Sequence, residues 1–136
     1  MQAAKQAVYS KLSGDATLLA LLPNGAGSIT YARPTTAPEP TLPLVTYLEV
    51  SSIFEPEIPL WTTRIQVSVF AKSADQADII GARVKALLHQ GQLTIPNSGR
   101  LDSIYLDSEQ EFYEEDTLLH HRAMDFRVRI YGPIDL

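Results

Sequence analysis

Residues 61–88, WTTRIQVSVFAKSADQADIIGARVKALL, decide the fold, because a strand pattern changes there into a helix pattern. The first part alternates with the two-residue period of a strand that has one packed face and one wet face. Its packed positions are Trp61, Thr63, Ile65, Val67 and Val69, and the wet ones are Thr62, Arg64, Gln66 and Ser68. Ser73 with Gln76 three residues later matches a capping box and predicts the start of a helix that ends near Gly91. The expected apolar stripe of that helix is Ala77, Ile80, Val84, Leu87 and Leu88.

Upstream, the sequence predicts two helices followed by strands. Residues 3–12 have an amphipathic helical pattern, and Asp15 can cap a second, short helix. The leucines of the short helix should lie in the core: Leu18, Leu19, Leu21 and Leu22. A short strand is predicted over residues 28–32 and a longer one over residues 44–50, whose Val45 and Tyr47 should face away from Leu44, Thr46, Leu48 and Val50.

Prolines separate and follow these two strands. The stretch 34–43 holds four prolines, which favour an extended surface arm and exclude a central strand. Residues 51–60 contain Pro56 and Pro59 and should turn the chain around.

Two long strands are predicted at the C-terminal end, over residues 100–112 and 118–131, and residues 92–95 could add a brief strand before them. If the long strands pair antiparallel across residues 113–117, even-numbered residues point inward. The expected partners are Ile104 with Phe126, Leu106 with Met124, and Phe112 with Leu118. The whole pattern predicts one α+β domain over residues 1–136: a mostly antiparallel sheet with an N-terminal helix pair and one amphipathic helix packed on one face.

Composition narrows the classes of function. The chain has 136 residues, of which 45% are hydrophobic and 20% charged, and it has no cysteine. These values are typical of a globular domain made in a reducing cytoplasm, and no apolar run is long enough to cross a membrane. A net charge of −5 argues against sequence-specific DNA binding, which depends on clustered Lys and Arg.

The residues suited to chemistry do not form a recognisable site. His120 and His121 are adjacent on a predicted strand and should point to opposite faces, so a shared metal is not expected. Asp125 should form an ion pair on the outward face with Arg127 and Arg129. The acidic run Asp107, Glu109, Glu111, Glu114, Glu115 and Asp116 lacks the spacing and glycine of a calcium loop, and a solvated hairpin tip is favoured over a charged interface. With no nucleophile motif either, we expect neither catalysis nor a cofactor or metal.

The stretch 53–61, IFEPEIPLW, places large apolar side chains in or beside a proline-broken turn. Either this loop folds back over the core or it anchors a protein interface, where aromatic residues are enriched. The candidate subunit-interface residues are Phe54, Ile58, Leu60, Trp61, Glu114 and Glu115.

Taken in order, these segments resemble the tail-completion proteins of siphophages, a family related to tail-terminator and head-to-tail joining proteins. The resemblance lies in residues 12–15 (LSGD) with the following leucines, the Ile29 and Tyr31 strand, the prolines leading into residues 42–45 (LPLV), residues 64–70 with the Ser73-capped helix, and the closing strand 121–130. The 54–61 loop has no counterpart in that pattern.

The resemblance implies a structural virion protein, assembled in the host cytoplasm, that forms a ring at the tail end. It implies a hexamer that contacts a tail tube protein and a head-neck connector protein, while genome DNA passes through the lumen without specific binding. Two alternatives stay open: a non-phage adaptor that binds one protein partner, and a small enzyme or ligand-binding domain that uses the carboxylates near His121.

Overall fold

The computed structural model describes residues 1–32 and 41–132. Its elements are α1 (Gln2–Ser13), α2 (Ala16–Ala20), a 3-10 turn (Gly25–Ser28), β1 (Ile29–Tyr31), β2 (Leu44–Glu55), β3 (Leu60–Ala71), α3 (Ala74–Leu88), β4 (Arg100–Glu114) and β5 (Leu119–Tyr131). The five strands form one sheet in the order β1-β2-β3-β5-β4. Only β1 pairs in parallel, with β2, so the predicted α+β class and the mostly antiparallel sheet are confirmed.

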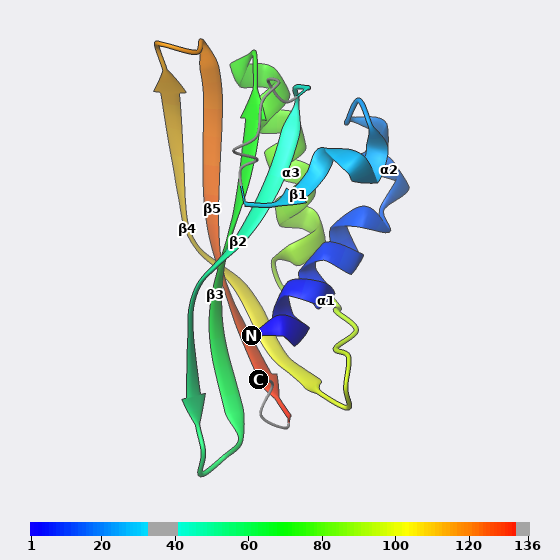
Figure 1. Ribbon diagram of the computed structural model, residues 1–136, viewed down its shortest axis with the longest axis vertical. Helices are drawn as coiled ribbons and strands as arrows, with labels where there is room; N and C mark the ends of the chain where they lie inside the picture. Colours follow the sequence, from blue (N-terminus) through cyan, green and yellow to red (C-terminus); the bar gives the residue numbers. More distant parts are fainter. Residues whose placement is uncertain (33–40, 133–136) are drawn as a thin grey trace.

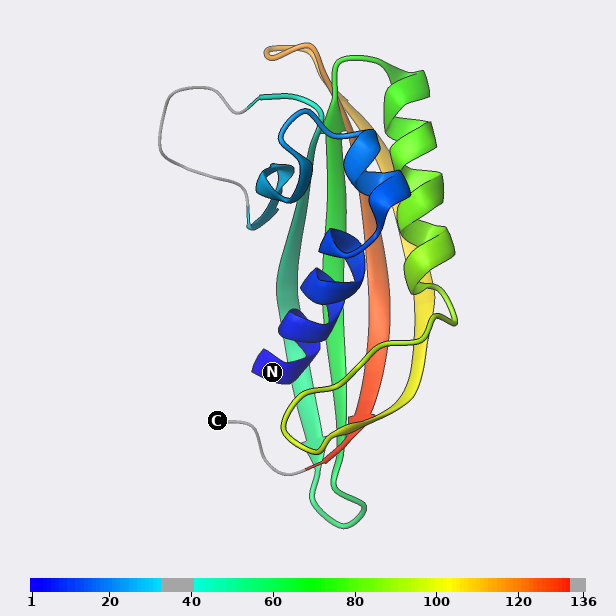
Figure 2. The same cartoon turned by 90° about the vertical axis from the view of Figure 1, so that its right-hand side faces the viewer.

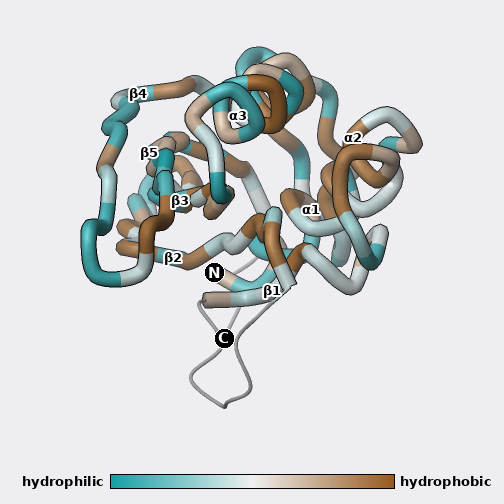
Figure 3. Tube along the Cα trace, turned by 90° about the horizontal axis from the view of Figure 1, so that it is seen from above, coloured by the Kyte–Doolittle hydropathy of each residue, from teal (hydrophilic) through white to brown (hydrophobic). Residues whose placement is uncertain are grey.

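The domain has two layers, with all three helices on one face of a long, twisted sheet (Figures 1 and 2). Seen along the long axis, the helices lie on the same side of the curved sheet (Figure 3). Within the described residues no helix covers the opposite face, which we call the open face. The two long hairpins, β2–β3 and β4–β5, point to opposite ends of the sheet (Figure 1).

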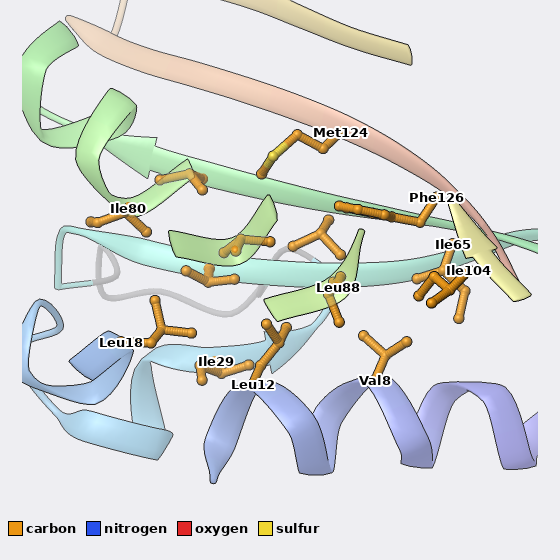
Figure 4. Close-up of a cluster of buried hydrophobic side chains, with 14 of the residues drawn as sticks. Val8, Leu12, Leu18, Ile29, Ile65, Ile80, Leu88, Ile104, Met124 and Phe126 are labelled. Carbon is orange, nitrogen blue, oxygen red and sulfur yellow. The ribbon is translucent and has the colours of Figure 1, made fainter. Parts of the chain in front are cut away.

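The core lies between the helices and the sheet (Figure 4). Val8 and Leu12 of α1 are fully buried, as is Leu18 of α2. They pack with Ile80, Val84 and Leu88 of α3 against Ile65, Val67, Met124 and Phe126 of the sheet. The predicted helix stripe is therefore confirmed, although Leu87 is only partly buried. A smaller cluster of Leu44, Phe70 and Leu119 lies apart from this core.

Both predicted helix caps are present. The Ser73 hydroxyl accepts a hydrogen bond from the Gln76 backbone N–H at 3.2 Å. The Asp15 carboxylate accepts one from the Leu18 N–H at 2.8 Å and also two from the Arg83 guanidinium, at 2.7 and 2.9 Å. Asp15 thus caps α2 and ties it to α3 at once.

This double role predicts an acid-sensitive contribution to stability. The Arg83 hydrogen bonds hold the pKa of Asp15 below its ordinary value of 3.8. A carboxylate whose pKa is lower in the folded than in the unfolded protein stabilises the fold fully above its unfolded pKa. This stabilisation is lost as pH falls through the folded pKa. We expect Asp15→Asn to cost about 0.5–1 kcal/mol at pH 7 and less at pH 2. Urea unfolding of both proteins at the two pH values measures this, and an equal difference at both would contradict it.

Five of the predicted strands are present and differ in extent from the prediction only at their ends. The strand predicted over residues 44–50 continues to Glu55 as β2, so the expected loop is a hairpin whose turn is confined to residues 56–59. Residues 92–95 form no strand. Of the expected proline arm, residues 34–40 lie outside the described residues.

The predicted register of the last hairpin is wrong. Ile104 pairs with Val128, Leu106 with Phe126 and Phe112 with His121. The turn is centred further along the chain, since β5 begins only at Leu119, and irregularities at 101/103 and 106/108 shift the pairing. Even-numbered residues face the core in β5 and, in β4, between the two irregularities, at Ile104 and Leu106. Before the first irregularity Leu101 packs on the core, and beyond the second Phe112 is 45% exposed.

Candidate assembly surfaces

The β2–β3 hairpin extends past the helix layer at one end of the sheet (Figure 1). Phe54 and Trp61 face each other across its stem, with ring centroids 4.8 Å apart. Ile53 and Ile58 are 63% and 47% exposed, whereas Leu60 is 1% exposed. The hairpin therefore combines an aromatic stem with an exposed apolar tip, and Leu60 lies beneath its surface.

The β4–β5 hairpin forms the opposite end. Its turn contains Glu115, and Glu114 accepts a hydrogen bond from the Thr117 hydroxyl at 2.9 Å. Beside these acids Tyr113 is 52% and Leu118 64% exposed. This tip is more than a solvated acidic turn, because large apolar side chains lie among its charges.

The six predicted interface residues thus divide between two sites. Four belong to the β2–β3 hairpin, and Glu114 and Glu115 belong to the β4–β5 hairpin at the other end. They cannot form one continuous patch on a single protomer. The protomer therefore carries two separate candidate surfaces, one at each end of the sheet.

The open face of the sheet carries a balanced set of charges. Asp107 lies 3.5 Å from the Arg64 guanidinium and 3.9 Å from that of Arg127, and Asp102 lies 3.9 Å from that of Arg129. The arginine side chains are 40–48% exposed, so each pair contributes little to stability. With these three arginines beside acids, this part of the face does not resemble the cationic surface that DNA binding requires.

Asp125 does not take part in these ion pairs, contrary to the prediction. It accepts hydrogen bonds from the Gln66 amide and the Ser108 hydroxyl, both at 3.1 Å. The prediction placed Asp125 correctly on the face of Arg127 and Arg129. Their partners are instead the aspartates of the neighbouring strand β4.

A tighter charge network lies on the other face, beneath α3. Arg122 of β5 contacts Asp78 of α3 and Glu109 of β4, and its guanidinium is 3.5 Å from Glu111. The Lys85 ammonium lies 2.9 Å from Glu109. Burial alone would raise the pKa of Glu109, but the neighbouring Lys85 and Arg122 hold it below the usual value.

Gly81 of α3 makes room for the Arg122 side chain. A Cβ at this position would lie 2.7 Å from the Arg122 Cδ. Replacing a helix-interior glycine with alanine ordinarily stabilises a protein by about 0.5–1 kcal/mol. We expect Gly81→Ala to destabilise this chain, and to stabilise it when Arg122 is also alanine. Thermal unfolding of Gly81→Ala, Arg122→Ala and the double variant measures the effect of Gly81→Ala on stability with and without the Arg122 side chain. A stabilising Gly81→Ala in the native background would contradict the steric argument.

Two hollows flank α1, and no sequence pattern indicated them. One, of about 290 Å³, lies between α1 and the β1–β2 edge, and one, of about 460 Å³, lies between α1 and residues 94–96. Tyr47 stands between Tyr9 and Tyr31, with ring centroids 5.8 and 5.2 Å away, and burial raises its pKa. The three rings come from three separate segments, so no local motif could reveal their cluster.

The arrangement of the described residues bears on metal binding and on membrane-spanning helices. No group of three or more His, Cys, Asp or Glu side chains in residues 1–32 and 41–132 is arranged to hold a metal ion. His120 contacts Tyr113, and His121 lies between Phe70 and Phe112, so the two histidines face opposite sides as expected. Within the same residues, no helix is both long and apolar enough to span a membrane.

Comparison with known proteins decides the family. The model of the family described as tail completion protein gp17 matches residues 6–131. The chain belongs to this family. The match spans most of α1, the two other helices and all five strands of the tail completion protein, so the family resemblance expected from the sequence is confirmed.

Solved structures include a protein of the same fold. A chain from a structure described as the virion of a native gene transfer agent particle superposes with a TM-score of 0.78. It is 24% identical to this tail completion protein, and the match covers 96% of each chain. No curated protein matches the chain. Family membership makes the chain a structural protein of a phage tail.

Proposed function

We propose that this tail completion protein forms a closed ring of six copies at the end of the tail tube, which terminates the tube and joins it to the head-neck connector. The family match over residues 6–131 carries the proposal. The fold likeness to a chain of a gene transfer agent virion supports a place inside a particle. In this proposal the protein has no catalytic role and no cofactor.

The shape of the protomer supports contacts in more than one direction. The hairpins at opposite ends of the sheet expose Ile53 and Ile58 on one side, and Tyr113 and Leu118 on the other. Closed rings arise when two different surfaces of one subunit meet in a head-to-tail contact whose rotation closes. Phe54, Ile58 and Trp61 would serve the contact between subunits, with Leu60 supporting the hairpin from within. Glu114 and Glu115 would serve a charged contact at the other end.

Genome DNA passes through the lumen of the proposed ring without specific binding. The net charge of −5 opposes phosphate binding, and each open-face arginine described above has an aspartate within 4 Å. Weak affinity suits a channel through which DNA must move, because clustered cations would retain the phosphates.

Sedimentation velocity and negative-stain electron microscopy of the purified protein, alone and with tail tubes, test the proposal. We expect a ring of six times the 15.0 kDa chain mass that caps tube ends. A protein that stays monomeric at every concentration and leaves tube ends unchanged would overturn the proposal. A one-to-one complex with a single partner and no ring would favour an adaptor instead.

A further inference from the structure

The hollows beside α1 have tyrosine side chains in their walls, and Lys5 lies at one of them. Both share Gln6 and Tyr9, so they adjoin along one side of α1. Lys5 lies at the first hollow with its ammonium 5.1 Å from the centre of the Tyr31 ring and 3.8 Å from the Glu49 carboxylate of β2. Helix α1 carries Lys5 and Lys11 and no acidic residue. The tyrosine walls therefore favour an apolar occupant, and Lys5, which stays partly exposed beside Glu49, can pair with an acidic side chain of that occupant.

The tip of the β2–β3 hairpin has that composition. Between its strands lie Pro56, Glu57, Ile58 and Pro59, preceded by Glu55, and residues 55–60 include no basic residue. Ile58 is 47% exposed and both glutamates are exposed. A proline-stiffened turn loses little conformational entropy when it docks, and aromatic side chains are favoured partners for such apolar anchors.

The tip cannot reach the hollows of its own chain. Strand pairing continues to Glu55 and Leu60, which holds the turn at the end of the sheet. The hairpin there points away from α1 and ends beyond the N-terminus of that helix (Figures 1 and 2). An occupant of this kind must come from another copy.

We propose that the β2–β3 hairpin tip of one copy docks into the hollows beside Tyr9 of the next, with Ile58 against the tyrosine rings and Glu57 near Lys5. This inference rests on the proposed ring and names the two surfaces that would meet in it. Tip and hollows are different surfaces, so the contact is head-to-tail, as ring closure requires.

Disulfide trapping tests the contact, since the chain has no cysteine of its own. Gln6→Cys and Ile58→Cys replace exposed residues on the two surfaces. After the two variants are mixed and oxidised, we expect mixed dimers to form roughly a hundredfold faster than with Gln6→Cys and Ile79→Cys, because neighbours in an assembly meet at millimolar effective concentration. Ile79 is the matched control, as it is 57% exposed on α3. Equal rates for the two pairs would overturn the inference.

Sedimentation of the same samples distinguishes failure of the proposed ring from failure of the proposed contact. If a ring forms without the disulfide between the Gln6→Cys and Ile58→Cys variants, the proposed function stands and the proposed contact is wrong. The proline-rich segment of residues 34–43 would then be the next occupant to test. Absence of any ring would overturn both. Exchanging the charges gives a second measure: Glu57→Lys and Lys5→Glu should each weaken assembly about tenfold, and the double variant should recover it. Additive losses in the double variant would contradict the pairing.

Discussion

Replacing both Phe54 and Trp61 with alanine is expected to weaken ring assembly about a hundredfold while the protomer remains folded. The two rings pack across the stem of the β2–β3 hairpin, 4.8 Å apart, and hold its tip in place. Loss of the pair costs the protomer about 0.5–1.5 kcal/mol beyond the lost buried area. Assembly loses more, because a mobile tip must be ordered again at every contact between subunits.

Sedimentation velocity over a concentration series measures the assembly constant, and circular dichroism confirms the protomer fold. Ile79→Ala on α3 is the control, because it removes an exposed apolar side chain that belongs to neither hairpin and should leave assembly unchanged. Unchanged assembly of the Phe54→Ala, Trp61→Ala variant would end the idea that this hairpin joins subunits.

The same hairpin shows how far local sequence patterns reach. The alternation over residues 61–71 predicted β3 and its buried positions Ile65, Val67 and Val69 correctly, because a strand with one buried face imposes a two-residue period on its own residues. Ser68, expected on the wet face, is only 5% exposed. Residues 51–55 lack that period, since Ser51 and Ser52 offer no apolar contrast. They are strand because Ser52 and Ile53 pair with Thr63 and Thr62. Pairing with a strong neighbour overrides a weak local signal.

The strand register and the positions of the candidate surfaces depend on contacts between residues that are distant in the sequence. The irregularity at 106/108 reverses the faces of the following residues and exposes Phe112, and no residue type around it marks the position. The candidate interface residues were found by composition, but their division between two ends follows from the order of the strands in the sheet. The tyrosine hollows likewise exist only once α1 lies against β1 and β2.

The Arg122 ion-pair network also could not be predicted from a local sequence pattern, because the acidic partners of Arg122 are distant in the sequence. Its side chain is 13% exposed and contacts Asp78, Glu109 and Glu111, which come from α3 and β4. We expect Arg122→Met to lower the free energy of unfolding by about 2–3 kcal/mol, somewhat less than the roughly 3–5 kcal/mol typical when one partner of a fully buried pair is removed. Because methionine keeps most of the side-chain packing, the decrease in the free energy of unfolding reports the loss of the charge interactions.

The matched control is Arg127→Met on the open face, whose side chain is 48% exposed and whose nearest acid is 3.9 Å away. It should cost no more than about 1 kcal/mol, since exposed pairs are weakened by solvent. Arg122, together with Lys85, holds the pKa of Glu109 below its usual value. The cost of Arg122→Met should therefore shrink at acid pH, as Glu109 takes up a proton. Urea unfolding at pH 7 and pH 4 measures both effects. Equal costs for the two arginines would show that the network beneath α3 is screened like a surface pair.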